Sequence, residues 1–103
     1  MLTKLTTAEV QAALEKLPGW SLDEGKLHKE FKFIDFRSAF GFLSMVALKC
    51  EAMNHHPEWF NVYSTVRVWL TSHEVDGISG NDVFVAQDME MVARCYRQPS
   101  QTR

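Results

Sequence analysis

Several signatures that would assign a chain directly to a functional class are missing from this sequence. Its 103 residues include two cysteines, Cys50 and Cys95, and no CxxC pair, so we predict neither a disulfide framework nor a dithiol redox motif. Both cysteines lie at apolar positions of predicted helices, and we expect two buried, reduced thiols. The sequence also lacks a glycine-rich loop of the kind that binds phosphate. Its 11 basic and 13 acidic residues are scattered, which argues against direct binding of nucleic acid.

Long apolar runs are absent as well. No segment approaches the length of a membrane-spanning helix, and Met1-Leu-Thr-Lys4 lacks the charged start and apolar core of a signal peptide. We therefore expect a cytoplasmic protein without membrane contact. The length fits a single domain over residues 1–103, in which the tail at 98–103 should fray.

Capping signals mark the starts of three predicted helices. Residues 6–9 and 79–82 each form a capping box, and Asp35 is a good N-cap. The first predicted helix ends at Pro18-Gly19, the second runs from Phe36 to about Asn54, and the third runs from Val83 to about Arg97.

Period-two alternation between turn signals predicts four strands. They comprise residues 20–22, 27–33, 59–63 and 66–72, with Ser64-Thr65 as the link between the last two. Hairpins that cluster, instead of alternating regularly with helices, predict an α+β fold. We expect a four-stranded antiparallel sheet with three helices packed on one face.

Two apolar stripes follow the long helix. The stripe expected to face the sheet comprises Phe36, Ala39, Phe40, Leu43, Val46, Ala47, Cys50 and Met53. The stripe expected on the flank comprises Phe42, Met45, Leu48 and Ala52. Either the apolar surface is wide and wholly internal, or the flank contacts another subunit. We favour the second interpretation, because exposed apolar patches usually mark association.

Candidate chemistry is concentrated in residues 51–61, where Pro57 should end the long helix at about His55. Imidazoles titrate near neutral pH and suit general acid and base roles, so His55, His56 and His73 are candidates. For each, the alternative is a histidine at the free carbonyls of a helix end or on the surface after a strand. Glu51, four residues before His55, could orient an imidazole or accept from a ligand's N–H donors, or could simply be solvated.

Other candidates have structural explanations. Asp82 is the third residue of a capping box, and Trp59 could wall a flat heterocycle or belong to the core or an interface. Three histidines and Glu51 match a catalytic zinc site in ligand count, but adjacent histidines rarely ligate one ion, and HExxH and HxH are absent. Cys50 lies mid-helix without the neighbours of a nucleophile. We therefore expect no metal.

Three segments together resemble the signature of the pterin-4a-carbinolamine dehydratases, the family that includes the dimerization cofactor of a homeodomain transcription factor. They are Asn54-His-His-Pro-Glu-Trp-Phe-Asn-Val-Tyr63, Thr71-Ser-His-Glu74 and Gly77-Ile-Ser-Gly-Asn-Asp82. The resemblance extends from about Trp20 to Tyr96 and leaves out the short N-terminal helix and the tail. It implies the α+β fold above and a homodimer or a tetramer built from two dimers.

The resemblance also implies a reaction. The family removes water from 4a-hydroxytetrahydropterin, the carbinolamine left by aromatic amino acid hydroxylases, and gives quinonoid dihydropterin, so that tetrahydrobiopterin is recycled. No metal or organic cofactor is implied. Expulsion of the hydroxyl needs a general acid, and a base then takes the N5 proton.

Site roles follow from the same resemblance. His55 and His73 are the implied alternative acids, and His56 is the implied binder and proton acceptor. Asp82 is expected to support His73. The residues expected to line or orient the pterin are Glu51, Asn54, Trp59, Thr71, Ser72 and Glu74. The sequence departs from the family pattern at Asn54, where many relatives carry Asp, and at Val75 and Asn81, which replace Cys and Arg in some animal members.

Two other functions remain open from the sequence. One is a binding module that bridges or stabilises a partner's dimer through Phe42, Met45 and Leu48, with a hydroxylase or a transcription factor as a possible partner. The other is a pterin-handling protein tied to molybdopterin. The three histidines favour the enzyme, since a pure scaffold would not need them.

Overall fold

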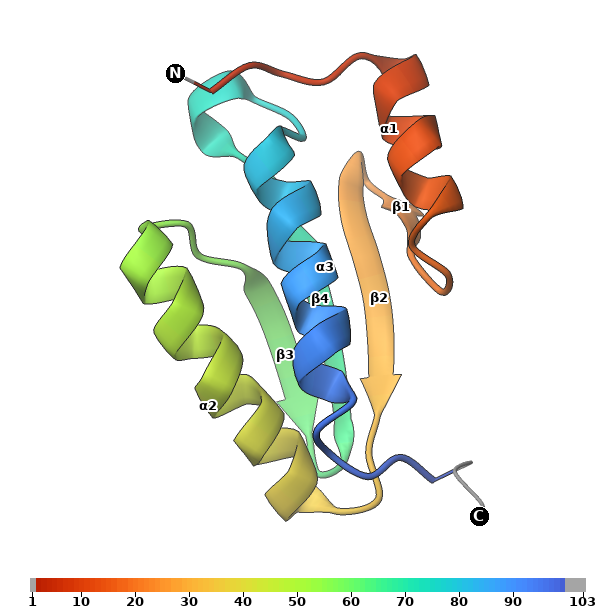
Figure 1. The fold of residues 1–103 in the computed structure, drawn as a ribbon, viewed down its shortest axis with the longest axis vertical. Helices are drawn as coiled ribbons and strands as arrows, with labels where there is room; N and C mark the ends of the chain where they lie inside the picture. The colour runs from red at the N-terminus through yellow and green to blue at the C-terminus, as the bar shows by residue number, and fades with distance from the viewer. Residues whose placement is uncertain (1, 100–103) are drawn as a thin grey trace.

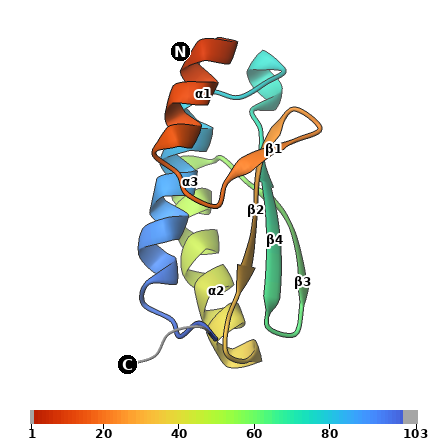
Figure 2. The ribbon, with the colours of Figure 1, turned by 90° about the vertical axis from the view of Figure 1, so that its right-hand side faces the viewer.

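Helices cover one face of a four-stranded antiparallel sheet and leave the other face open (Figure 2). In this computed structural model residues 2–99 are described. Within them the order is α1 (Thr7–Glu15), β1 (Ser21–Asp23), β2 (Lys26–Lys32), α2 (Phe36–Met53), β3 (Glu58–Val62), β4 (Thr65–Leu70), a 3₁₀ turn η1 (His73–Val75) and α3 (Gly80–Ala93) (Figure 1). The predicted α+β fold class is confirmed. No helix in this described range is long and apolar enough to cross a membrane.

The sheet has the strand order β1-β2-β4-β3, so β2 and β4 are central. Side chains alternate between the faces of a strand, so the register decides which ones meet the helices. The helix-covered face includes the cross-strand pairs Leu27–Leu70, Phe31–Val66 and Trp59–Val68. The central strand β4 therefore directs Val66, Val68 and Leu70 inward, as predicted.

Both hairpins turn through left-handed backbone. Glu24 and Gly25 have φ angles of 52° and 77°, as expected for a tight two-residue turn. In the second hairpin the turn comprises residues 63–64, one residue earlier than predicted, and Tyr63 has a φ of 51°. The side-chain amide of Asn61 donates to the carbonyls of Tyr63 (3.1 Å) and Thr65 (2.9 Å). These bonds hold a turn that lacks the preferred Asn-Gly sequence.

The three predicted N-caps are confirmed. Both capping boxes, at residues 6–9 and 79–82, have their reciprocal hydrogen bonds. Asp35 accepts from the backbone N–H of Ser38 at 2.8 Å, and this hydrogen bond holds the pKa of the Asp35 carboxyl below its usual range. With Ser79 as its cap, α3 begins at Gly80 and ends at Ala93, several residues before the predicted bounds at each end.

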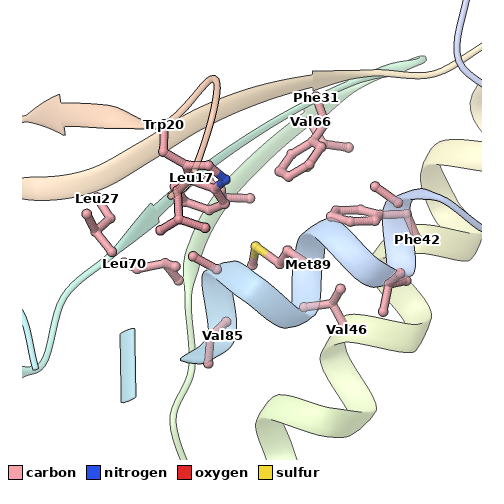
Figure 3. Packing of buried hydrophobic residues seen from close by; sticks show 14 of the residues in the cluster. Leu17, Trp20, Leu27, Phe31, Phe42, Val46, Val66, Leu70, Val85 and Met89 are labelled. Atoms are coloured by element: carbon pink, nitrogen blue, oxygen red, sulfur yellow. The ribbon is translucent and has the colours of Figure 1, made fainter. Parts of the chain in front are cut away.

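The core lies between the sheet and the helices. Figure 3 shows Leu27, Phe31, Val66 and Leu70 of the sheet facing Phe42 and Val46 of α2 and Val85 and Met89 of α3. Leu17 and Trp20, from the segment between α1 and β1, close one side of this cluster. The indole N–H of Trp20 donates to Glu90 at 2.8 Å, so its polar atom is satisfied at the edge of the core.

The buried face of α2 differs from the prediction. Phe42, expected on the flank, is fully buried, and its ring centroid lies 4.8 Å from that of Phe31 and 5.1 Å from that of Phe33. Phe36 and Phe40, expected in the core, are 47% and 57% exposed. The residues of α2 that are buried are Ala39, Phe42, Leu43, Val46 and Cys50. Ala39, Leu43, Val46 and Cys50 were predicted to face the sheet and are buried, so the error lies in taking Phe36 and Phe40 instead of Phe42 into this face.

Candidate active site

The end of α2 places the two adjacent histidines on different sides of the chain. Asn54 adopts a left-handed conformation (φ 53°, ψ 43°), and the backbone N–H of His55 donates to the carbonyl of Cys50 at 3.0 Å. This is a common way to end a helix, and asparagine is one of the few residues that adopts it readily. The turn directs His55 inward, where it is 8% exposed, whereas His56 remains on the surface.

His55 forms a buried pair with a carboxylate from α3. Its Nε2 lies 2.6 Å from Oδ1 of Asp82, which has no solvent exposure. Asp82, expected to support His73, therefore contacts His55 instead. The pairing follows from topology, because α2 and α3 pack against each other and run in opposite directions, so the end of α2 and the start of α3 lie toward the same end of the molecule (Figure 1). A buried carboxylate beside an imidazole can stabilise its cationic form and fix its orientation.

Two serines complete the surroundings of Asp82. Its Oδ2 accepts from the hydroxyl of Ser72 at 2.8 Å and from the backbone N–H of Ser79 at 2.9 Å. The two serine hydroxyl oxygens lie 2.7 Å apart. Ser72 was predicted to contact substrate, but its side chain is buried and its hydroxyl is engaged by Asp82. Sequence reasoning missed Ser79 as a site residue, although the capping box already placed it beside Asp82.

His56 pairs with Glu51 on the surface. Nε2 of His56 lies 2.7 Å from Oε1 of Glu51, and these side chains are 56% and 78% exposed. The sequence suggested a pair between Glu51 and His55, which are four residues apart on a helix. The left-handed residue Asn54 breaks that spacing, so the carboxylate contacts the next histidine.

His73 begins the 3₁₀ turn η1 and extends into solvent. Its side chain is 86% exposed, and its Nε2 lies 3.9 Å from Oε2 of Glu58, too far for a hydrogen bond. The loop that carries it is closed by two backbone bonds, from the N–H of Ser72 to the carbonyl of Gly77 (2.7 Å) and from the N–H of Gly77 to the carbonyl of Ser72 (3.3 Å). β4 therefore ends at Leu70, and Ser72, which was expected to continue it, forms an isolated bridge with Gly77.

One small pocket brings the three candidate histidines together. It has a volume of about 250 Å³. Its walls are Asn54, His55, His56, Thr71, Ser72, His73 and Glu74. A neighbouring hollow of about 390 Å³ contains Glu51, His56 and Trp59, and apolar side chains form much of its wall. His56 lines both the pocket and the hollow, so a ligand in the pocket would lie close to the flat ring of Trp59. Trp59 also packs against the core, as the structural alternative predicted.

The sequence offers three histidines and Glu51, the ligand count of a catalytic zinc site. Within residues 2–99 no three histidine, cysteine, aspartate or glutamate side chains group in a way that could hold a metal ion. Two of the histidines that line the pocket are each paired with one carboxylate, His55 with Asp82 and His56 with Glu51.

The two thiols differ in their surroundings. Cys50 is 2% exposed, and burial raises its pKa to about 11. Cys95 is exposed, so the prediction that both thiols are buried is wrong for this residue. The reason is that α3 ends at Ala93 and leaves Cys95 beyond the packed helix face.

We expect a thiol reagent to modify Cys95 in the native protein well before Cys50, because only the thiolate reacts and Cys50 is both covered and held protonated. Titration with a chromogenic disulfide should give one fast thiol per chain, and a second after denaturation. The Cys95→Ser variant should lose the fast phase. Two fast thiols in the native protein would contradict the buried position of Cys50.

Comparison with known protein families gives a match over most of the chain. The family model described as pterin 4 alpha carbinolamine dehydratase matches residues 3–92. The chain belongs to this family. The match includes the N-terminal helix, which the resemblance in the sequence had left outside. Segments around all three histidines lie within the matched range.

Relatives in the pterin-4-alpha-carbinolamine dehydratase family match nearly end to end. A protein of Solibacter usitatus provisionally named as such a dehydratase is 48% identical over 93 residues, which is 90% of this chain and 98% of that protein. A protein of Burkholderia multivorans with the same provisional name is 44% identical over 102 residues, covering 97% of this chain and all of that one. A crystal structure described as a transcriptional coactivator/pterin dehydratase from Brucella melitensis superposes with a TM-score of 0.85 at 41% identity, covering 88% of this chain and 99% of that chain.

Proposed function

We propose that this chain is a lyase that dehydrates a 4a-hydroxytetrahydropterin, the pterin-4a-carbinolamine, to quinonoid dihydropterin. The observation that carries the proposal is the pocket in which three histidines meet, one of them paired with a buried carboxylate. The family name and the names of the relatives support the same reaction. The proposal requires no metal or organic cofactor.

The reaction needs one acid and one base. The lone pair of N5 forms a double bond to C4a while the bond from C4a to the hydroxyl oxygen breaks. That oxygen leaves as water once an imidazolium has given it a proton. A base then removes the proton from N5 of the cationic intermediate, and the product differs from the substrate by one water molecule. A proton taken at N5 and returned to the acid closes the cycle.

The geometry favours particular roles for the histidines. We assign His55 as an acid toward the hydroxyl, because it lines the pocket and the buried Asp82 carboxylate, 2.6 Å from its Nε2, can fix the orientation of its ring. His73, exposed at the rim of the pocket, is the alternative acid. His56 is assigned as binder and acceptor of the N5 proton, and Glu51 beside it can accept from the paired N–H groups of a pterin.

The wider role is part of the same proposal. The product is the form from which tetrahydrobiopterin is regenerated, so the enzyme would serve aromatic amino acid hydroxylases in the cytoplasm. Phe36, Phe40, Met45 and Leu48 leave a row of exposed apolar side chains on α2. This row supports a homodimer or homotetramer.

A second candidate is a coactivator-type binding module on the same fold. The Brucella melitensis structure is described with both terms, and the exposed side chains of α2 could contact a partner. The sequence proposed Phe42 in that contact, but Phe42 is fully buried and unavailable to a partner. The pocket with three histidines favours the enzyme as the principal function.

The proposal is tested by following the ultraviolet absorbance of a 4a-hydroxytetrahydropterin that a hydroxylase generates in place. We expect the protein to accelerate dehydration over buffer and to keep this activity after treatment with a chelator. His55→Ala should lower kcat by about 10²-fold, and His56→Ala and His73→Ala should lower it less, because their side chains are more exposed.

His28→Ala is the matched control. This fourth histidine stacks on Trp69 with ring centroids 4.7 Å apart and does not line the pocket. Its replacement should leave kcat near the wild-type value. A wild-type rate no faster than buffer would reject the dehydratase and favour partner binding, whereas loss of activity to the chelator alone would point to a metal.

A further inference from the structure

We infer that Ser72 and Ser79 are positioning residues: they hold the Asp82 carboxylate so that His55 keeps its proton on Nε2 and presents Nδ1 to the pocket. This inference rests on the proposed function and specifies which atom of His55 acts. It also changes the expected role of Ser72 from contact with substrate to support of the acid.

The direction of each hydrogen bond around Asp82 can be assigned. The backbone N–H of Asn81 donates to the hydroxyl oxygen of Ser79 at 3.2 Å. The hydroxyl of Ser72 donates its one hydrogen to Oδ2 of Asp82, at 2.8 Å. Toward Ser79, whose hydroxyl oxygen is 2.7 Å away, Ser72 can therefore act only as the acceptor. The donors therefore run in one direction, from Asn81 through Ser79 and Ser72 to Asp82.

This order keeps Asp82 in its acceptor form. Oδ2 accepts two hydrogen bonds, one from the Ser72 hydroxyl and one from the Ser79 backbone N–H at 2.9 Å. Hydrogen bonds of this kind favour the charged carboxylate. Oδ1 then faces Nε2 of His55 at 2.6 Å and accepts a hydrogen bond from its N–H. The neutral ring is thus the Nε2–H tautomer.

Nδ1 of His55 is left for the substrate. It makes no hydrogen bond within the described part of the chain, and no buried side-chain nitrogen or oxygen there lacks a partner, so Nδ1 must be accessible. His55 lines the pocket of about 250 Å³. When the ring is cationic, Nδ1–H is the proton that can be given to the leaving hydroxyl. When the ring is neutral, Nδ1 is an acceptor.

Burial makes the arrangement rigid. Ser79 and Asp82 have no exposed surface, and Ser72 is 1% exposed, so water does not compete for these groups. Each of the two serines also has a backbone role, since Ser79 caps α3 and Ser72 closes the loop of His73. The same two residues therefore position His55 through Asp82 and fix one end of the loop that holds His73.

The tautomer can be read directly by long-range ¹H–¹⁵N correlation of the histidine rings at mildly alkaline pH, where an ordinary imidazole is neutral. In the wild type we expect a protonated Nε2 and an unprotonated Nδ1 for His55. Ser72→Ala should give a mixture of tautomers and lower kcat by about 10-fold, with KM within about 2-fold, because positioning affects the reacting state more than binding. Ser72→Thr, which keeps the hydroxyl, should restore both the tautomer and kcat.

Ser44→Ala is the control, because Ser44 is exposed on α2 and lies outside the pocket. A wild-type proton on Nδ1, or a Ser72→Ala variant with wild-type tautomer and kcat, would overturn the inference. If Ser72→Ala does not fold, the wild-type tautomer alone decides the matter. A tautomer shift in Ser72→Ala without any dehydratase activity in the wild type would reject the proposed function and support the positioning role.

Discussion

Asp82→Asn is expected to lower kcat for carbinolamine dehydration by about 10²- to 10⁴-fold, although asparagine has nearly the same shape as aspartate. The substitution keeps the side chain in its buried position and changes only one oxygen to an amino group. The large effect is expected because the neighbours of Asp82 are all donors. These donors determine how the side-chain amide of the asparagine variant is oriented.

The side-chain amide of an asparagine at this position can satisfy its neighbours in only one of its two orientations. The hydroxyl of Ser72 and the N–H of Ser79 both direct hydrogens at the site of Oδ2, so the carbonyl oxygen should lie there. The amino group then faces Nε2 of His55, which must accept, and the ring proton moves to Nδ1. In the proposed mechanism the imidazolium form of His55 protonates the leaving hydroxyl, and in this variant it would lose its charge partner and meet a repelling donor.

Steady-state kinetics with the carbinolamine substrate measure this effect. Asp88→Asn is a suitable control, because Asp88 also lies on α3, pairs with Lys49 at 3.2 Å and does not line the pocket. Thermal unfolding of both variants shows whether the fold is retained. A folded Asp82→Asn protein with kcat within a few-fold of wild type would contradict the role of the pair between His55 and Asp82.

Phe42→Ala is expected to cost about 3–5 kcal/mol of the free energy of unfolding. Phe42 has no exposed surface and packs on Phe31 and Phe33 between the sheet and the helices. Truncation removes most of an aromatic side chain and leaves a cavity that a rigid sheet closes only in part. For a domain of this size the loss is a large share of the whole stability.

Phe40→Ala is the matched comparison. It makes the same chemical change two residues away on the same helix, but Phe40 is 57% exposed. We expect a loss below about 1 kcal/mol. Chemical denaturation followed by circular dichroism, repeated at several protein concentrations, separates this effect from any self-association through α2. Similar losses for the two variants would contradict the observed orientation of the helix.

Much of the fold could be predicted from local signals. Capping boxes, Asp35 and the turn residues located the helix starts and hairpins, because each of these signals acts within a few residues. The orientation of α2 could not be predicted in the same way. Most of the predicted sheet-facing stripe is buried, but only the tertiary structure decides that the ring of Phe42 fills the space beside Phe31 and Phe33.

The sequence named several residues that the structure brings into one pocket, but it did not indicate most of their contacts. The sequence brought His55 and His56 together and identified Asp82, but it did not pair Asp82 with His55. These residues are 27 positions apart, and their contact depends on how α3 returns beside α2. The left-handed turn at Asn54 likewise moved Glu51 from His55 to His56, and nothing in the helical spacing indicates such a turn.

Two backbone hydrogen bonds between Ser72 and Gly77 close the loop of residues 73–76, so the conformation of this loop does not depend on pairing with β4. Main-chain atoms hold the ends of this loop whatever side chains it carries, and the hydroxyl of Ser72 keeps its bond to Asp82. The rim of the pocket can therefore diverge in sequence while the buried acid and its histidine stay fixed. His73, 86% exposed in this loop, is therefore the candidate histidine whose replacement is expected to cost the least stability.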